Sequence, residues 1–231
     1  MISKLIPVAL ASVFLLGGCA QNSSTDAVAP EKGDPDFLVA RNTHSELYLN
    51  PETSRGAASF REIYIAPVDL SKMQIIQPEG VTTDEEWKVT DVEKDFLQNN
   101  VAKQFSTQLS YESAYNVVER REQADMVVHT TVVAIHPYAT RDDIAAGAKA
   151  GGAITISLAL INAETGLVML RSVDTKSTDN IWAFNQIDND EQAIDLIFRA
   201  WGANMRRGLL QLQGRSSDPL AEPFQLKPQT K

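Results

Sequence analysis

Residues 153–174, AITISLALINAETGLVMLRSVD, decide the fold of this chain. From Ala153 to Ile161, large aliphatic side chains alternate with small or polar ones, which is the period of a strand with one buried face. The turn sequence NAETG follows, and its Gly166 can adopt a positive φ. Leu167 to Asp174 has the composition of a returning strand. The stretch therefore predicts an antiparallel β-hairpin.

Three further strands are predicted upstream of this hairpin, from short segments rich in β-branched and aromatic residues. They span Glu62–Val68, Tyr115–Glu119 and Asp125–His136. The segment Thr140–Gly151, rich in alanine and glycine, is predicted to be a loop or a frayed helical turn.

Two amphipathic helices are predicted from the spacing of apolar residues. Thr90 and Glu93 have the Thr-x-x-Glu pattern of a capping box, and a helix of about twenty residues follows. Its expected apolar stripe is Val92, Phe96, Val101, Phe105 and Leu109. Asp188 and Glu191 stand in cap and N3 positions of the second helix, which Gly214 can end. The stripe of that helix is Ile194, Ile197, Phe198, Trp201, Met205, Leu209 and Leu212.

These elements predict an α+β fold of two layers. We expect an antiparallel-rich sheet of about five strands, with the two helices packed on one face. The order along the chain is one strand, one helix, four strands and one helix. With 231 residues, 43% of them hydrophobic, the chain can bury the core of one domain, predicted at residues 37–213. Three prolines among polar residues predict an extended tail over residues 214–231.

The N-terminus has the layout of a secretory signal. A short basic start, Met1 to Lys4, precedes a mostly apolar run from Leu5 to Leu16. A transmembrane helix is the alternative, but it needs about 20 apolar residues, and polar residues follow too soon. A buried helix with a core cysteine is another alternative, which the basic start and the N-terminal position disfavour.

The apolar run ends in Leu16, Gly17, Gly18 and Cys19, which resembles the lipobox of bacterial lipoproteins. The resemblance implies that residues 1–18 are a signal peptide removed by cleavage before Cys19. It also implies that this cysteine carries a covalent diacylglycerol and an N-acyl chain, and we expect no other cofactor. Several acyl chains hold a protein firmly on a membrane.

Residues 19–36 are expected to form the lipidated cysteine and a flexible tether, because they contain almost no bulky apolar side chain. Ala20 stands where signals for retention in the inner membrane typically place aspartate. By analogy with such lipoproteins, we expect an outer-membrane location with the domain facing the periplasm.

Charge and cysteine content exclude several classes of function. The formal net charge is -9, and an acidic surface repels phosphate backbones, so we expect no nucleic-acid partner. Cys19 is the only cysteine, so one chain can form neither a disulfide nor a thiolate metal cluster.

The sequence contains little that points to catalysis or to a metal. His129 and His136 are seven residues apart on one predicted strand, which places them on opposite faces of the sheet. Asp188 to Glu191 resemble the start of a calcium loop, but Ala193 and Arg199 occupy the positions that need glycine and glutamate. Known hydrolase and nucleotide-binding motifs are lacking. We therefore expect a protein without catalytic or metal-binding residues.

The segment from Pro137 to Gly152 is the candidate partner-binding loop. It is longer than a hairpin requires, and excess loop length often serves recognition. Its candidate residues are Tyr138, Arg141, Asp142 and Asp143. The alternative is a long loop that only drapes across one end of the sheet.

Three segments carry a resemblance to a known family: Tyr48-Leu49-Asn50-Pro51 ahead of FREIYIAPVDL, the Gly151-Gly152 entry to the hairpin, and the closing helix with Trp201. They resemble a family of proteobacterial lipoproteins catalogued as a domain of unknown function. The family brings no agreed catalytic residues. The order of elements is also similar to that of small α+β envelope accessory lipoproteins, such as activators of peptidoglycan synthases and the curli secretion lipoprotein.

These observations favour a non-enzymatic accessory or interaction module of the cell envelope, anchored to a membrane by its lipid. Its expected partner is an envelope protein or the cell wall, and the oligomeric state stays open. One alternative is a periplasmic hydrolase that uses carboxylates to act on envelope material, which requires two carboxylates about 5 to 10 Å apart. The other alternative is a subunit of a secretion complex.

Overall fold

The computed structural model describes residues 38–41, 45–50, 54, 56–81, 86–181 and 191–215 of the chain. Its strands form one open, mixed sheet in the order β1-β2-β8-β7-β6-β3-β5, and β4 pairs with β6 beside this path. The strands are β1 (Leu38–Arg41), β2 (Ser45–Leu49), β3 (Glu62–Ile65), β4 (Gln74–Ile75), β5 (Asn116–Val118), β6 (Met126–Pro137), β7 (Gly152–Asn162) and β8 (Val168–Thr178). The α+β class is confirmed, but the prediction of about five strands was too low, because β1, β2 and β4 are too short to show a period.

The predicted hairpin is confirmed as β7 and β8, which lie at the centre of the sheet and pair antiparallel. Gly166 has a φ of 72° in the connecting turn, as its place in the sequence required. β6 pairs antiparallel with the other edge of β7. These three long strands are the base on which the other elements assemble.

The sheet also contains parallel pairs, which the sequence did not predict. β3 pairs parallel with both β5 and β6, and β4 pairs parallel with β6. β3 and β5 are joined through α1 (Asp91–Leu109), a connection long enough to return the chain to the same end of the sheet.

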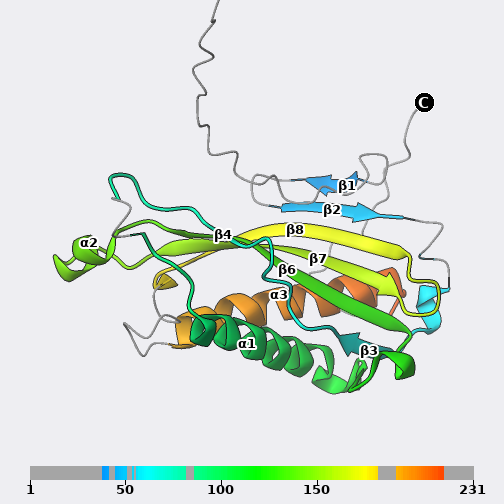
Figure 1. Ribbon diagram of the computed structural model, residues 1–231. Coiled ribbons are helices and arrows are strands. Elements are labelled where there is room, and N and C mark those ends of the chain that lie inside the picture. The colour runs from blue at the N-terminus through cyan, green and yellow to red at the C-terminus, as the bar shows by residue number, and fades with distance from the viewer. Residues whose placement is uncertain are drawn as a thin grey trace, which may run out of the picture.

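Both long helices pack beneath the same face of the sheet (Figure 1). α1 begins with the predicted capping box, in which Thr90 and Glu93 each satisfy the other's backbone N–H. α3 (Glu191–Leu212) crosses α1 closely, since a Cβ added to Gly202 would lie 3.0 Å from the Gln108 side chain. The third helix, α2 (Arg141–Ala145), is short and lies in the segment Thr140–Gly151, for which a loop or a frayed helical turn was predicted. None of the helices described here has the length and hydrophobicity needed to span a membrane.

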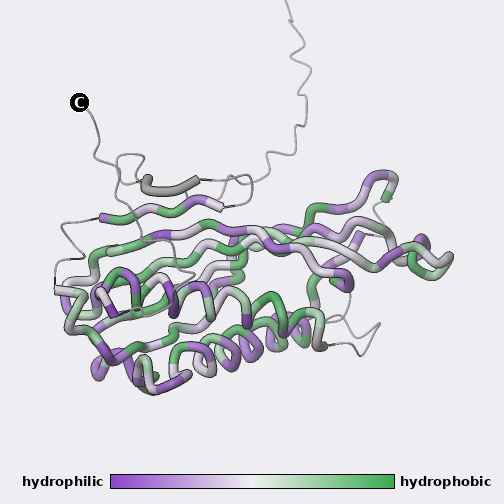
Figure 2. Tube along the Cα trace, turned by 180° about the vertical axis from the view of Figure 1, so that it is seen from behind, coloured by the Kyte–Doolittle hydropathy of each residue, from purple (hydrophilic) through white to green (hydrophobic). Residues whose placement is uncertain are grey.

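The core lies between the sheet and these helices. The predicted stripe of α3 is buried from Ile194 to Leu209. The predicted stripe of α1 was partly wrong, because Val92 is 57% exposed and Leu97 takes its place in the core. Figure 2 shows hydrophobic stretches along the central strands and hydrophilic stretches along the outer sides of the helices.

Candidate functional site

The candidate loop residues lie in a projecting arm, which we define as residues 136–153. Figure 1 shows the ends of β6 and β7, with α2 between them, extending beyond the near ends of α1 and α3. Tyr138 is 55% exposed, its ring stands edge-on to His136 at 5.2 Å, and its hydroxyl lies 3.3 Å from Ser177 Oγ. These contacts fix an exposed aromatic ring against the sheet.

The acidic residues of the loop have a different role from Tyr138. Asp143 is the third residue of α2, and its carboxylate accepts hydrogen bonds from the backbone N–H and the hydroxyl of Thr140. These bonds lower the pKa of Asp143 below its usual value. Asp142 is exposed in the first turn of α2, and the side chain of Arg141 is outside the described part. Asp143 therefore caps α2, and its contacts do not include Tyr138.

The prediction that His129 and His136 lie on opposite faces was wrong. A β-bulge between Val132 and Ala134 adds one residue to β6, which reverses the alternation of side chains beyond it. His129 pairs with Ala159 and His136 with Ala153, residues of one face of β7. The two imidazoles thus share a face but lie six β7 residues apart, about 20 Å. Within the described residues, no three His, Cys, Asp or Glu side chains are grouped so that they could hold a metal ion.

A groove of about 570 Å³ lies between the helix-facing side of β2 and β8 and the C-terminal half of α3. It exists because α3 lies below β7 and β8, and no described helix covers the β2 end of the sheet (Figure 1). Leu47 and Leu49 of β2, and Leu158 and Leu160 of β7, line its upper wall. Met205 and Leu209 of α3 line the lower wall.

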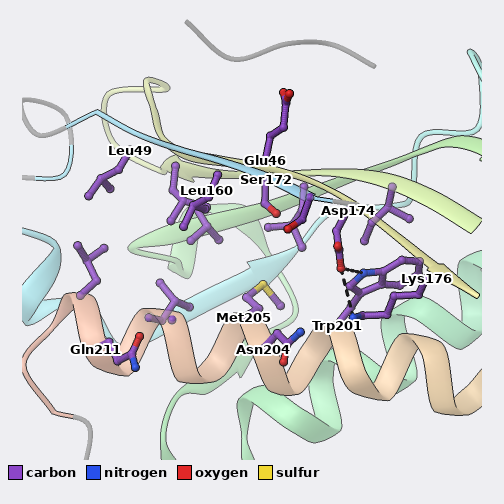
Figure 3. Close-up of a pocket in the computed structure, with 18 residues that line it drawn as sticks. Glu46, Leu49, Leu160, Ser172, Asp174, Lys176, Trp201, Asn204, Met205 and Gln211 are labelled. Atoms are coloured by element: carbon purple, nitrogen blue, oxygen red, sulfur yellow. Dashed lines mark hydrogen bonds and ion pairs between the residues drawn. The ribbon is translucent and has the colours of Figure 1, made fainter. Parts of the chain in front are cut away.

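The groove changes from mostly apolar to mostly polar along its length, although Gln211 of α3 lines the leucine-rich end (Figure 3). Leu49, Leu170 and Leu212 line one end, where β8 begins and α3 finishes. At the other end, Asp174 Oδ2 accepts a hydrogen bond of 2.7 Å from Trp201 Nε1 and lies 3.3 Å from Lys176 Nζ. Ser172 lines the groove between the two ends. Glu46 borders the groove too, but its carboxylate points away from it (Figure 3).

Sequence reasoning missed this groove. The signal was present in β8, where Leu170, Ser172, Asp174 and Lys176 alternate with residues of the opposite face. On the helix-facing side of β8 the side chains change from apolar to polar, which indicates that a helix does not fully cover this part of the sheet. The sequence of β8 could not show which helix forms the other wall of the groove, because α3 begins thirteen residues after β8 ends.

The lipobox residues Leu16, Gly17, Gly18 and Cys19, the tether, His44, Asp188 and the tail from residue 216 all lie outside the described residues. The predictions made for them stay predictions.

Three solved structures are similar to the chain at low identity. The PelC dodecamer from Paraburkholderia phytofirmans has 10% identity and a TM-score of 0.37, over 69% of this chain and 96% of that one. A protein of the DUF330 family from Xanthomonas campestris has 14% identity and a TM-score of 0.41, over 73% and 94%. A minor lipoprotein from Acinetobacter baumannii has 8% identity and a TM-score of 0.32, over 67% and 93%. TM-scores below 0.5 are too low to transfer fold or function from these proteins.

No curated protein matches the sequence. One family model does match, over residues 39–205, which contain the hairpin, the strand wall of the groove and most of α3. This match agrees with the resemblance carried by the Tyr48-Leu49-Asn50-Pro51 segment, the Gly-Gly entry to β7 and Trp201. The chain belongs to the family described as "Protein of unknown function (DUF3313)".

Proposed function

We propose that this protein is a lipid-anchored lipoprotein of the cell envelope that binds an envelope protein, without catalysis, through the arm of residues 136–153. The observation that carries the proposal is the projection of this arm past the helical layer, together with the exposed ring of Tyr138 within the arm. β6 has 12 residues, about 40 Å, whereas the 19 residues of α1 and the 22 residues of α3 extend about 28 and 33 Å. The strands therefore reach beyond their own helical support.

An exposed, immobilised aromatic ring is well suited to protein recognition. Tyrosine is enriched among residues that dominate binding energy, since it supplies a large contact area at a small entropic cost. The contacts of Tyr138 with His136 and Ser177 hold the ring before any partner arrives, which reduces the entropy lost on binding.

The carboxylates of the groove support binding over hydrolysis. A glycosidase needs two of them facing each other across a cleft. Asp174 points into the groove, where it is engaged by Trp201 and Lys176, while Glu46 points away (Figure 3). This arrangement disfavours the carboxylate hydrolase.

The anchor is tested by changing the proposed lipid attachment residue. We expect Cys19→Ser to move the protein from the membrane fraction to the soluble periplasmic fraction and to abolish labelling by a radioactive fatty acid. Separation of inner and outer membranes then tests the location that Ala20 suggests. Membrane association that is unchanged in Cys19→Ser would disprove the anchor.

The arm is tested by site-specific photocrosslinking in intact cells. A photoreactive phenylalanine analogue replaces Tyr138 in one strain and Tyr111, 52% exposed beyond the C-terminal end of α1, in another. We expect discrete crosslinked envelope proteins from position 138 and none of the same size from position 111. Equal products at the two positions, or none at either, would refute the proposal.

A further inference from the structure

We propose that the groove between β2, β8 and α3 binds a free single-chain anionic amphiphile, a long-chain fatty acid, with its carboxylate at Lys176. This site is separate from the arm and goes beyond the function proposed above. The proposal rests on the length of the groove, the change of polarity along it and the hydrogen-bonding state of its walls.

The length of the groove suits one acyl chain. From Leu170 to Lys176, the lining side of β8 covers six residues, about 20 Å. One acyl chain spans half of a hydrocarbon core of roughly 30 Å, or about 15 Å. The groove is thus long enough for a single acyl chain and leaves about 5 Å for the headgroup.

The polarity of the groove orders such a ligand. Leucines from β2, β7, β8 and α3 can cover the methylene chain, whose transfer from water is favourable. At the polar end, the Lys176 ammonium has three donors, one of which faces Asp174. The other two can donate to an anionic headgroup. The side chains of Lys176 and Asp174 are 26% and 18% exposed, so a headgroup can reach them.

Asp174 does not oppose this ligand as strongly as an isolated carboxylate would. Its Oδ2 already receives the indole N–H of Trp201 and faces the Lys176 ammonium, so the charge at this end is balanced. With a ligand carboxylate bound, the Lys176 ammonium would lie between two carboxylates and could donate a charge-assisted hydrogen bond to each.

The backbone around the groove disfavours a peptide as the occupant. β2 is hydrogen-bonded to β1 and β8, β8 is hydrogen-bonded to β2 and β7, and the lower wall is a helix. An inserted peptide, including the tail of this chain, would find few backbone partners for its own N–H and C=O groups. Buried backbone groups without partners are costly, whereas an acyl chain has none to satisfy.

Gly208 supplies a selective way to fill the groove. It lines the lower wall, and a Cβ added there would meet no atom within 4 Å. Gly208→Phe therefore places a ring in the groove and also replaces a poor helix former with a better one. Arg199→Phe, on the exposed face of the same helix and away from the groove, is the matched control.

The first experiment titrates cis-parinaric acid, a fluorescent long-chain carboxylic acid, into residues 20–231, which contain every described element. We expect saturable binding to the wild type and to Arg199→Phe, and at least a tenfold loss of affinity in Gly208→Phe, with circular dichroism unchanged. No saturable binding, or equal affinities for the two phenylalanine variants, would overturn the proposal.

The second experiment tests the headgroup. Palmitate and hexadecanol, which share a chain length, compete with the probe. We expect Lys176→Met to weaken palmitate at least tenfold and hexadecanol less than twofold, while Lys176→Arg retains palmitate binding. Equal losses for both ligands would contradict the role of Lys176. If binding appears only after residues 216–231 are removed, the tail occupies the groove and the proposal is wrong.

Discussion

The indole Nε1 of Trp201 donates a hydrogen bond of 2.7 Å to Oδ2 of Asp174, and this bond joins α3 to β8. Trp201 is only 4% exposed and packs against Phe198, with 5.5 Å between the ring centroids. One partly buried carboxylate thus receives the indole N–H and faces the Lys176 ammonium. The contact fixes the distance between helix and sheet at the polar end of the groove.

Trp201→Phe should lower the free energy of unfolding by about 2 kcal/mol, because a hydrogen bond to a charged group is lost. Urea denaturation followed by circular dichroism measures the change. The same substitution in an Asp174→Asn background is the control, since the bond is then no longer to a charged acceptor. Strictly additive effects of the two substitutions would show that the bond contributes nothing of its own.

Gly152→Ala should destabilise the protein by about 1 to 3 kcal/mol, the usual cost of overpacking. An added Cβ would lie 2.7 Å from the His136 carbonyl oxygen and 2.7 Å from Ile181 Cβ, and Ile181 is fully buried. Gly151→Ala is the matched control, because the nearest atom there is 3.3 Å away. Thermal unfolding compares the two variants, and equal melting temperatures would contradict the prediction.

Asp125→Ala should destabilise the start of β3 by about 1 to 2 kcal/mol. Asp125 Oδ2 accepts from the backbone N–H of Arg61, at 2.7 Å, and of Glu62, at 3.0 Å. Asp125→Asn keeps an acceptor oxygen and should lose less than half as much stability. Hydrogen exchange at the amides of residues 61 and 62 provides a local readout, and unchanged exchange in Asp125→Ala would be evidence against the role.

Local sequence patterns predicted the strands and helices that bury one face and expose the other. The hairpin followed from its alternation and from Gly166, and α1 followed from Thr90 and Glu93. The faces of His129 and His136 could not be predicted, because the bulge in β6 is an outcome of pairing with β7. The parallel pairs of β3 were missed for a similar reason, since a strand of four residues contains no information about its neighbours.

The candidate site was predicted only in part. The length of the segment after Pro137 indicated a recognition loop, and the structure leaves Tyr138 of this segment exposed. The groove depends on how far the sheet extends past α3 at β2, which is set by the packing of elements that are distant in the sequence. The polar residues Ser172, Asp174 and Lys176 indicate that a helix does not fully cover this part of the sheet, but they do not identify the helix that faces them.

Alkaline pH should weaken the fold through Tyr115. This side chain is buried, its hydroxyl donates to Gln213 Oε1 at 2.9 Å, and burial raises its pKa to about 12, against lowering effects of Arg215 and Arg61. Because the folded pKa lies above the unfolded value of about 10, the protonated tyrosine stabilises the fold below pH 10. This contribution is lost as the pH rises from 10 to 12.

Tyr115→Phe removes the titrating group, so its stability should fall less steeply between pH 10 and 12 than that of the wild type. At pH 8 it should be less stable by about 1 kcal/mol, since the hydrogen bond to Gln213 is lost. Urea denaturation at pH 8, 10 and 11 measures both effects. Tyr138→Phe, at an exposed tyrosine, is the control and should follow the wild-type profile. Parallel profiles for Tyr115→Phe and the wild type would show that ionisation of Tyr115 does not limit alkaline stability.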